Sequence, residues 1–193
     1  MSDKITNVLV VGVGGQGIIL AGEILAMVAM NAGLDVKKSE VHGMAQRGGS
    51  VNSQVRIGKK VFSPVIPDGE VDILLSFEKL EPLRWIEGCN KKTIALVNSQ
   101  KIHSLTTATS LQQYPEDVED ELKKQFKNLH YVPAKDIAEE LGNIRVVNVI
   151  LLGLMAKMMD FPKQAWIKAL KQRLPEKLIP INMKAFERGY ELG

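Results

Sequence analysis

The residues best suited to chemistry lie in a glycine-rich segment near the N-terminus, Gly12-Val13-Gly14-Gly15-Gln16-Gly17. This segment follows the apolar run NVLVV (7–11) and precedes a helical pattern, the context that the G-x-G-x-x-G motif requires. Glycines permit positive φ and close ligand approach, and the free N–H groups at a helix start attract an anion. We therefore predict a site for a phosphate- or carboxylate-bearing ligand at Gly12, Gly14, Gly15, Gln16 and Gly17. The alternative is a tight strand-to-helix crossing in which Gln16 merely caps the helix.

A second polar segment, SEVHGMAQRGGSVN (39–52), follows the next expected strand. In a doubly wound sheet, the end of that strand faces the same crevice as the first glycine turn. A guanidinium beside two glycines suits phosphate or carboxylate, because the guanidinium fork and the backbone N–H groups can all donate. The candidate ligand- or partner-binding residues here are His42, Gln46, Arg47, Gly48 and Gly49. The alternative is an ordered surface loop in which Arg47 pairs with a neighbouring carboxylate.

Alternating strand and helix patterns must position these two segments. The 193 residues predict a single α/β domain, 1–193, of Rossmann-like three-layer architecture with a mostly parallel sheet. Strands are expected at 7–11, 35–40, 51–57, 71–77, 93–97 and 129–132, and helices at 17–32, 80–86, 116–126, 134–141, 146–159, 164–174 and 183–190. A β-hairpin is expected near residues 51–66, with a second strand at 61–66 that prolines either confine to an edge or end.

Composition excludes several classes of protein. One cysteine, Cys89, cannot hold an iron–sulfur cluster or a cysteine-rich zinc site, and His42, His103 and His130 lie far apart. We therefore expect no metal site and no cofactor bound by this chain. The net charge of +3 comes from scattered lysines, which argues against nucleic acid as a partner. The longest nearly uncharged stretch contains Glu23 and clustered glycines, so we expect no membrane span, and a cytoplasmic location follows by default.

Three further segments, together with these loops, carry a family resemblance. The five segments are VLVVGVGGQGIILAGEIL (8–25), SEVHGMAQRGGSVNSQVRIG (39–58), DILLSFEKLE (72–81), IALVN (94–98) and VVNVILLG (146–153). Together they closely resemble the beta subunit of indolepyruvate ferredoxin oxidoreductase. That subunit belongs with the gamma subunits or domains of pyruvate and other 2-oxoacid ferredoxin oxidoreductases. The HGMAQRGGSV form of the second loop is more typical of the indolepyruvate branch. Asn148, a polar residue in the apolar 146–153 helix, matches the family pattern and is expected either to reach the crevice or to make a helix N-terminal hydrogen bond.

The resemblance implies a non-catalytic small subunit that is inactive alone. In this family, thiamine diphosphate and the [4Fe-4S] clusters reside on a large catalytic partner subunit. The complex converts a 2-oxo acid and coenzyme A to acyl-CoA, carbon dioxide and reduced ferredoxin, and in the indolepyruvate branch the substrates are aryl pyruvates. An exposed apolar patch near the glycine-rich loops is expected to contact the partner. The alternatives are a free-standing NAD(P)-binding oxidoreductase, with Glu40 as the ribose-binding acid, and a nucleotide-binding regulatory module.

Overall fold

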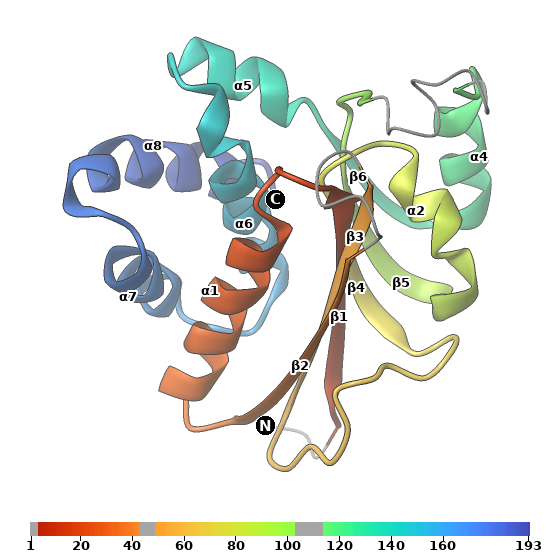
Figure 1. Ribbon diagram of the computed structural model, residues 1–193, viewed down its shortest axis with the longest axis horizontal. Helices are drawn as coiled ribbons and strands as arrows, with labels where there is room; N and C mark the ends of the chain where they lie inside the picture. The colour runs from red at the N-terminus through yellow and green to blue at the C-terminus, as the bar shows by residue number, and fades with distance from the viewer. Residues whose placement is uncertain (1–3, 43–48, 103–113) are drawn as a thin grey trace.

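The computed structural model describes residues 4–42, 49–102 and 114–193 and shows one sheet with helices on both faces (Figure 1). Its six strands follow the order β2-β3-β1-β4-β5-β6. They are β1 (Thr6–Val13), β2 (Asp35–His42), β3 (Ser50–Gly58), β4 (Val71–Ser76), β5 (Cys89–Asn98) and β6 (Asn128–Val132). Among these described strands β3 alone runs against the others, since it pairs antiparallel with both β2 and β1. The predicted α/β class and mostly parallel sheet are confirmed.

The apolar run of β1 reflects its central place in this sheet. Val8 and Val10 belong to the core on one face, whereas Leu9 and Val11 belong to the core on the other. A strand flanked by helix layers on both sides has no polar face, so its residues need not alternate. The uniform run NVLVV predicted this two-sided burial correctly.

The hairpin predicted near residues 51–66 is wrong. β3 forms, but residues 61–66 are irregular throughout. Both edges of β3 are occupied, one by β2 and the other by β1, so no edge is left for residues 61–66. Side chains instead fix the segment: Asp35 accepts a hydrogen bond from the Val61 N–H (2.8 Å), and Gln54 accepts one from the Ile66 N–H (2.7 Å).

Helices form two unequal layers around the sheet (Figure 1). One face is covered by α1 (Ile18–Asn31), α6 (Val147–Met158), α7 (Lys163–Arg173) and α8 (Ile179–Tyr190), with α5 (Ala134–Glu140) packed on α6 and α8. The other face carries α2 (Glu81–Arg84) and α4 (Val118–Gln125). Short 3-10 turns η1 (Ile86–Gly88), η2 (Ile144–Val146) and η3 (Glu176–Leu178) complete the described elements. The three-layer prediction is confirmed.

α6 and α8 cross with their backbones almost touching. A Cβ atom placed on Gly153 would lie 2.2 Å from the Phe186 carbonyl oxygen, and one on Gly189 would lie 1.9 Å from the Ile150 carbonyl oxygen. Both positions therefore require glycine, and the close crossing fixes α6, whose first turn reaches the site described below. Within the described ranges, no helix is both long and apolar enough to cross a membrane.

Candidate functional site

The glycine turn lies at the point where the chain changes sides of the sheet. β1 and β4 are neighbours, yet β1 leads into α1 on one face and β4 leads into α2 on the other (Figure 1). Ligands of open α/β sheets bind in the crevice at the carboxyl ends of the strands at such a switch point. The predicted site therefore sits where this architecture places ligands.

Positive φ angles make glycine necessary within the turn. Gly15 has φ of 101° and Gly17 has φ of 86°, a region that residues with a Cβ rarely adopt. The Gly14 N–H donates to the Gly49 carbonyl at 2.9 Å, which joins the turn to the end of the second polar segment. The structure thus brings Gly49 to the first turn, as the sequence predicted.

Gln16 fastens the turn to two strands. Its Oε1 accepts from the Val13 N–H at 2.6 Å, and its Nε2 donates to the Phe77 carbonyl at 2.8 Å. Val13 ends β1 and Phe77 directly follows β4, so one side chain bridges the two strands of the switch point. Gly12 is part of this arrangement, because a Cβ there would lie 2.8 Å from Gln16 Oε1. Both hydrogen bonds of the Gln16 side chain therefore go to the strands and not to the start of α1.

Asn148 reaches the same turn from the first turn of α6. A Cβ on Gly17 would lie 2.7 Å from Asn148 Nδ2, so the two residues are in direct contact. The side chain is 8% exposed, and its Oδ1 has no hydrogen-bond partner among the described residues. This oxygen therefore accepts no hydrogen bond from the N–H groups at the start of α6. Of the two roles expected for Asn148, the structure therefore matches the one that reaches the crevice.

These residues border an open hollow, here called the glycine-turn cleft, of about 420 Å³. It is lined by Gly15, Gln16, Gly17, Gln100, Ile102, Ile144, Arg145, Val147 and Asn148. The first N–H groups of α1 have no acceptor within the helix, and the helix dipole adds positive potential there. Arg145, an exposed residue of the turn η2, adds a guanidinium. The combination suits a ligand that carries a phosphate or carboxylate.

Sequence reasoning missed Gln100, Ile102 and Arg145. Gln100 and Ile102 follow β5, and Arg145 precedes α6, so tertiary packing alone brings them to the turn. The one available signal is position: in a parallel sheet, residues just after β5 lie at the same edge as those just after β1.

The remaining predicted residues fall in the second polar segment. His42 is the last residue of β2, opposite Val51 of β3. Gln46, Arg47 and Gly48 lie outside the described residues, so their predicted role stays a prediction.

Two buried carboxyl groups lie behind the cleft, at the end of β4. Glu78 is 1% exposed and Glu81 is 2% exposed. Glu81 accepts from the Ser50 hydroxyl at 2.5 Å and lies 3.5 Å from Arg84 Nε. Burial raises the pKa of Glu81, whereas the Ser50 hydrogen bond and the Arg84 charge oppose that rise. Glu81 thus ties the start of β3 to α2.

Glu40 does not stand where a ribose-binding acid would. Its Oε1 pairs with Lys38 Nζ at 2.6 Å on β2, an edge strand. In the dinucleotide-binding layout this acid ends the strand beside β1. Here β3 lies between β2 and β1, which separates Glu40 from β1 by two strand spacings, about 10 Å. Glu40 therefore does not lie in the position expected of a ribose-binding acid.

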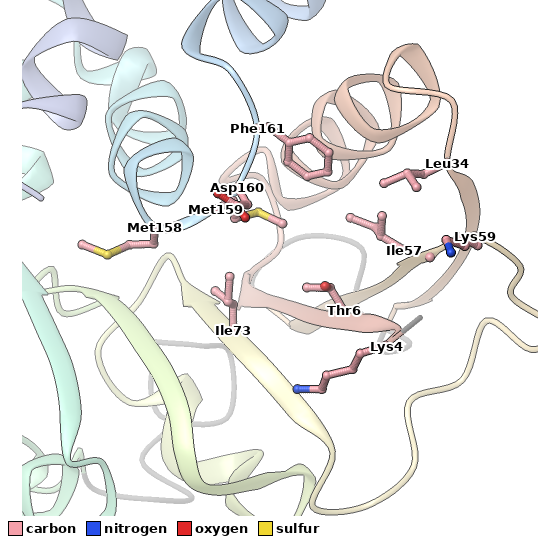
Figure 2. A pocket seen from close by; sticks show the side chains of 11 residues that line it. Lys4, Thr6, Leu34, Ile57, Lys59, Ile73, Met158, Met159, Asp160 and Phe161 are labelled. Carbon is pink, nitrogen blue, oxygen red and sulfur yellow. The ribbon is translucent and has the colours of Figure 1, made fainter. Parts of the chain in front are cut away.

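A second hollow of about 280 Å³ lies at the opposite end of β1, lined mostly by apolar side chains. In Figure 2, Phe161 and Leu34 lie on its helix side, while Thr6, Ile57 and Ile73 come from the strands. It lies far from the helix N-terminus and the glycine turn that suit an anion. Across the described ranges, no group of three or more His, Cys, Asp or Glu residues could hold a metal ion.

Exposed apolar side chains do not concentrate at the cleft. In the described chain, three exposed large hydrophobic residues lie near the glycine-rich loops: Ile144 in the cleft wall, Ile19 at the start of α1 and Val41 (53%) near the end of β2. The most exposed one, Phe62 (82%), follows the far end of β3. Residues 43–48 of the second loop lie outside the described residues, so the predicted apolar patch near the glycine-rich loops stays a prediction.

The fold and site define an α/β protein with an anion-suited cleft at a topological switch point. Residues 7–192 match the family model for pyruvate ferredoxin/flavodoxin oxidoreductase, and the chain belongs to this family. It is 38% identical to the indolepyruvate oxidoreductase subunit IorB of Archaeoglobus fulgidus, over 95% of this chain and 93% of that one. It is 29% identical to the common gamma subunit of the pyruvate/ketoisovalerate oxidoreductases of Pyrococcus furiosus, over 93% of this chain and 92% of that one.

A solved structure of a related subunit has the same fold. The crystal structure of the pyruvate oxidoreductase subunit PORC of Thermotoga maritima superposes with a TM-score of 0.73 at 26% identity, over 97% of this chain and 96% of that one. The end-to-end match to separate subunits shows that this chain is a small subunit of a 2-oxoacid ferredoxin oxidoreductase. The family resemblance in the sequence is confirmed.

Proposed function

We propose that this chain is the small subunit of an oxidoreductase that acts on indolepyruvate and related aryl pyruvates. The complex would convert the 2-oxo acid and coenzyme A to acyl-CoA, carbon dioxide and reduced ferredoxin. The observation that carries the substrate class is the higher identity to indolepyruvate oxidoreductase subunits than to subunits shared by pyruvate and ketoisovalerate enzymes. The loop sequence HGMAQRGGSV favours the same branch.

The redox and carbon chemistry would belong to a large partner subunit. One cysteine cannot provide the four thiolates of a [4Fe-4S] cluster, so electrons must leave through another chain. Thiamine diphosphate, when bound by that partner, would supply the carbanion chemistry of decarboxylation. The small subunit would therefore be inactive alone.

The glycine-turn cleft is the part of this chain that would serve the reaction. Both reactants are anionic, coenzyme A through its phosphates and the 2-oxo acid through its carboxylate. The free N–H groups at the start of α1 and the Arg145 guanidinium favour binding of such a group. Gly12, Gly14, Gly15, Gln16 and Gly17 would shape the backbone of that site, and Gly49 would hold it against the second segment.

The test is the substrate range of the anaerobic complex with its large subunit. We expect coenzyme A-dependent reduction of ferredoxin with indolepyruvate or phenylpyruvate, at a kcat/KM at least about tenfold above those for pyruvate and 2-ketoisovalerate, a difference of about 1.4 kcal/mol. Equal or higher kcat/KM for pyruvate would refute the assignment to aryl pyruvates. The small subunit alone should show no turnover.

A further inference from the structure

Glu78 is a buried acid that accepts hydrogen bonds from four donors in three parts of the chain. Its Oε2 accepts from the backbone N–H groups of Leu80 (2.7 Å) and Glu81 (3.1 Å). Its Oε1 accepts from the Ile102 N–H (3.1 Å) and from the Tyr114 hydroxyl (2.7 Å). Two carboxylate oxygens have about four acceptor positions, so this side chain is fully used.

One of these donors belongs to the wall of the glycine-turn cleft. Ile102 lines the cleft, and its backbone N–H is the group that Glu78 Oε1 holds. Gln100, also in the wall, is tied to the same segment, because the Lys79 N–H donates to its carbonyl at 3.1 Å. The chain after β5 is thus attached to the chain after β4 at two successive points.

The opposite wall of the cleft depends on the same segment. The carbonyl of Phe77, adjacent to Glu78, accepts from Gln16 Nε2 (2.8 Å) and from Asn98 Nδ2 (3.0 Å). Residues 77–81 therefore connect the glycine turn with the exit of β5. Glu78 lies within this connection between the two walls.

We propose that Glu78 is the positioning residue of the glycine-turn cleft, holding Ile102 at the place where the cleft accepts an anionic reactant. This inference rests on the proposed function, because it assigns the residue that shapes the same site. Glu78 does not line the cleft, so it acts through Ile102 and makes no contact with the ligand.

Tyr114 closes the arrangement on the far side of Glu78. Burial and the neighbouring Glu78 both raise the pKa of the Tyr114 hydroxyl, so it stays a donor at every physiological pH. Lys101 and Lys79 lie 4.3 Å and 5.9 Å from the Tyr114 ring centre. Both ammonium groups thus lie over the face of the ring, which favours the packed position of Tyr114.

Glu78→Gln tests the proposal selectively. The amide oxygen can keep the two bonds to Leu80 and Glu81, and the Tyr114 hydroxyl can rotate to accept from the new NH₂. The Ile102 N–H loses its acceptor, because it then faces the NH₂ group, which is itself a donor. Tyr114→Phe is the milder variant, because it keeps the acceptor of the Ile102 N–H but removes the second donor that fixes the same oxygen, Oε1, in place. Glu121→Gln, in an exposed ion pair on α4, is the matched control.

The assay is the steady-state kinetics of the reconstituted complex, with coenzyme A and indolepyruvate varied separately. We expect Glu78→Gln to raise KM for one of these two anionic reactants about 5- to 30-fold, because a buried donor loses its acceptor. We expect kcat to change by less than about twofold. Hydrogen–deuterium exchange of the peptide at residues 98–102 should become faster in Glu78→Gln and stay unchanged in Glu121→Gln.

Two results would overturn the proposal: both KM values within twofold of the unchanged protein, or a fall in kcat at constant KM, which a purely structural role produces. If Glu78→Gln fails to assemble, Tyr114→Phe decides, with a two- to fivefold KM rise expected and an unchanged KM contradicting. A wild-type complex inactive on every 2-oxo acid would instead refute the proposed function. In that case the exchange at residues 98–102 still tests the role of Glu78.

Discussion

Replacing Gln16 by alanine tests whether this side chain holds the two central strands together. The substitution removes the acceptor of the Val13 N–H and one of the two donors to the Phe77 carbonyl. Val13 is buried, so its N–H loses a partner in a site with limited access to water. The Phe77 carbonyl keeps its bond from Asn98 at 3.0 Å and is less affected.

The magnitude follows from these two losses. A buried donor without an acceptor costs about 1–3 kcal/mol, and an ordinary hydrogen bond contributes about 1 kcal/mol. Gln16 is itself half-buried, which lets water reach the vacated space and places the first value near its lower end. We therefore expect Gln16→Ala to lower the free energy of unfolding by about 2 kcal/mol.

Urea unfolding of the full chain, followed by circular dichroism, measures this difference. With a slope of about 2–3 kcal/mol per molar, the midpoint should fall by about 0.7–1 M. Gln172→Ala, at an exposed position on α7, is the matched control and should change the free energy by less than about 0.5 kcal/mol. Equal effects of the two variants would refute the bridging role of Gln16.

Three further predictions test the fold and the buried groups. Gly189→Ala should destabilise by about 3 kcal/mol in urea unfolding, because its Cβ would meet the Ile150 carbonyl at 1.9 Å, whereas Gly88→Ala, with its nearest atom at 3.6 Å, should be nearly neutral. Burial raises the pKa of Glu81, so the folded state holds that proton more tightly and the stability of the wild type falls as pH rises above 4.5. Relative to wild type, Glu81→Gln should therefore gain stability between about pH 4 and pH 7. A pH-independent difference between the two proteins would contradict this. Burial raises the pKa of Cys89 to about 11, so iodoacetamide at pH 8 should alkylate it about 100-fold more slowly than an ordinary thiol, and equal rates would show that it is accessible and ionised.

Local patterns predicted the parts of this molecule that local physics decides. The glycine turn needs positive φ at Gly15 and Gly17, and only glycine tolerates that cheaply, so the motif is visible in the sequence. The run NVLVV has no polar face, which already requires helices on both sides of β1. Asn148 was predicted as a polar exception within an apolar helix, and it does contact the turn.

What escaped prediction depends on which distant segments meet. The position of β3 between β2 and β1 is a long-range pairing, and it removed the edge that residues 61–66 would have needed. Arg145 and Gln100 carry no local signal, because the packing of α6 and β5 brings them to the cleft. Glu78 resembles an ordinary surface acid in the sequence, and its four donors become apparent only when the exits of β4 and β5 lie side by side.

The most direct test of the central claim, that this chain is a small subunit serving an aryl pyruvate enzyme, is anaerobic capture of the tagged protein from its native source. We predict that it retains a larger chain carrying thiamine diphosphate and iron–sulfur clusters, and that the captured complex reduces ferredoxin with indolepyruvate and coenzyme A. Recovery of the chain alone, with a tightly bound nucleotide and no such partner, would contradict the account.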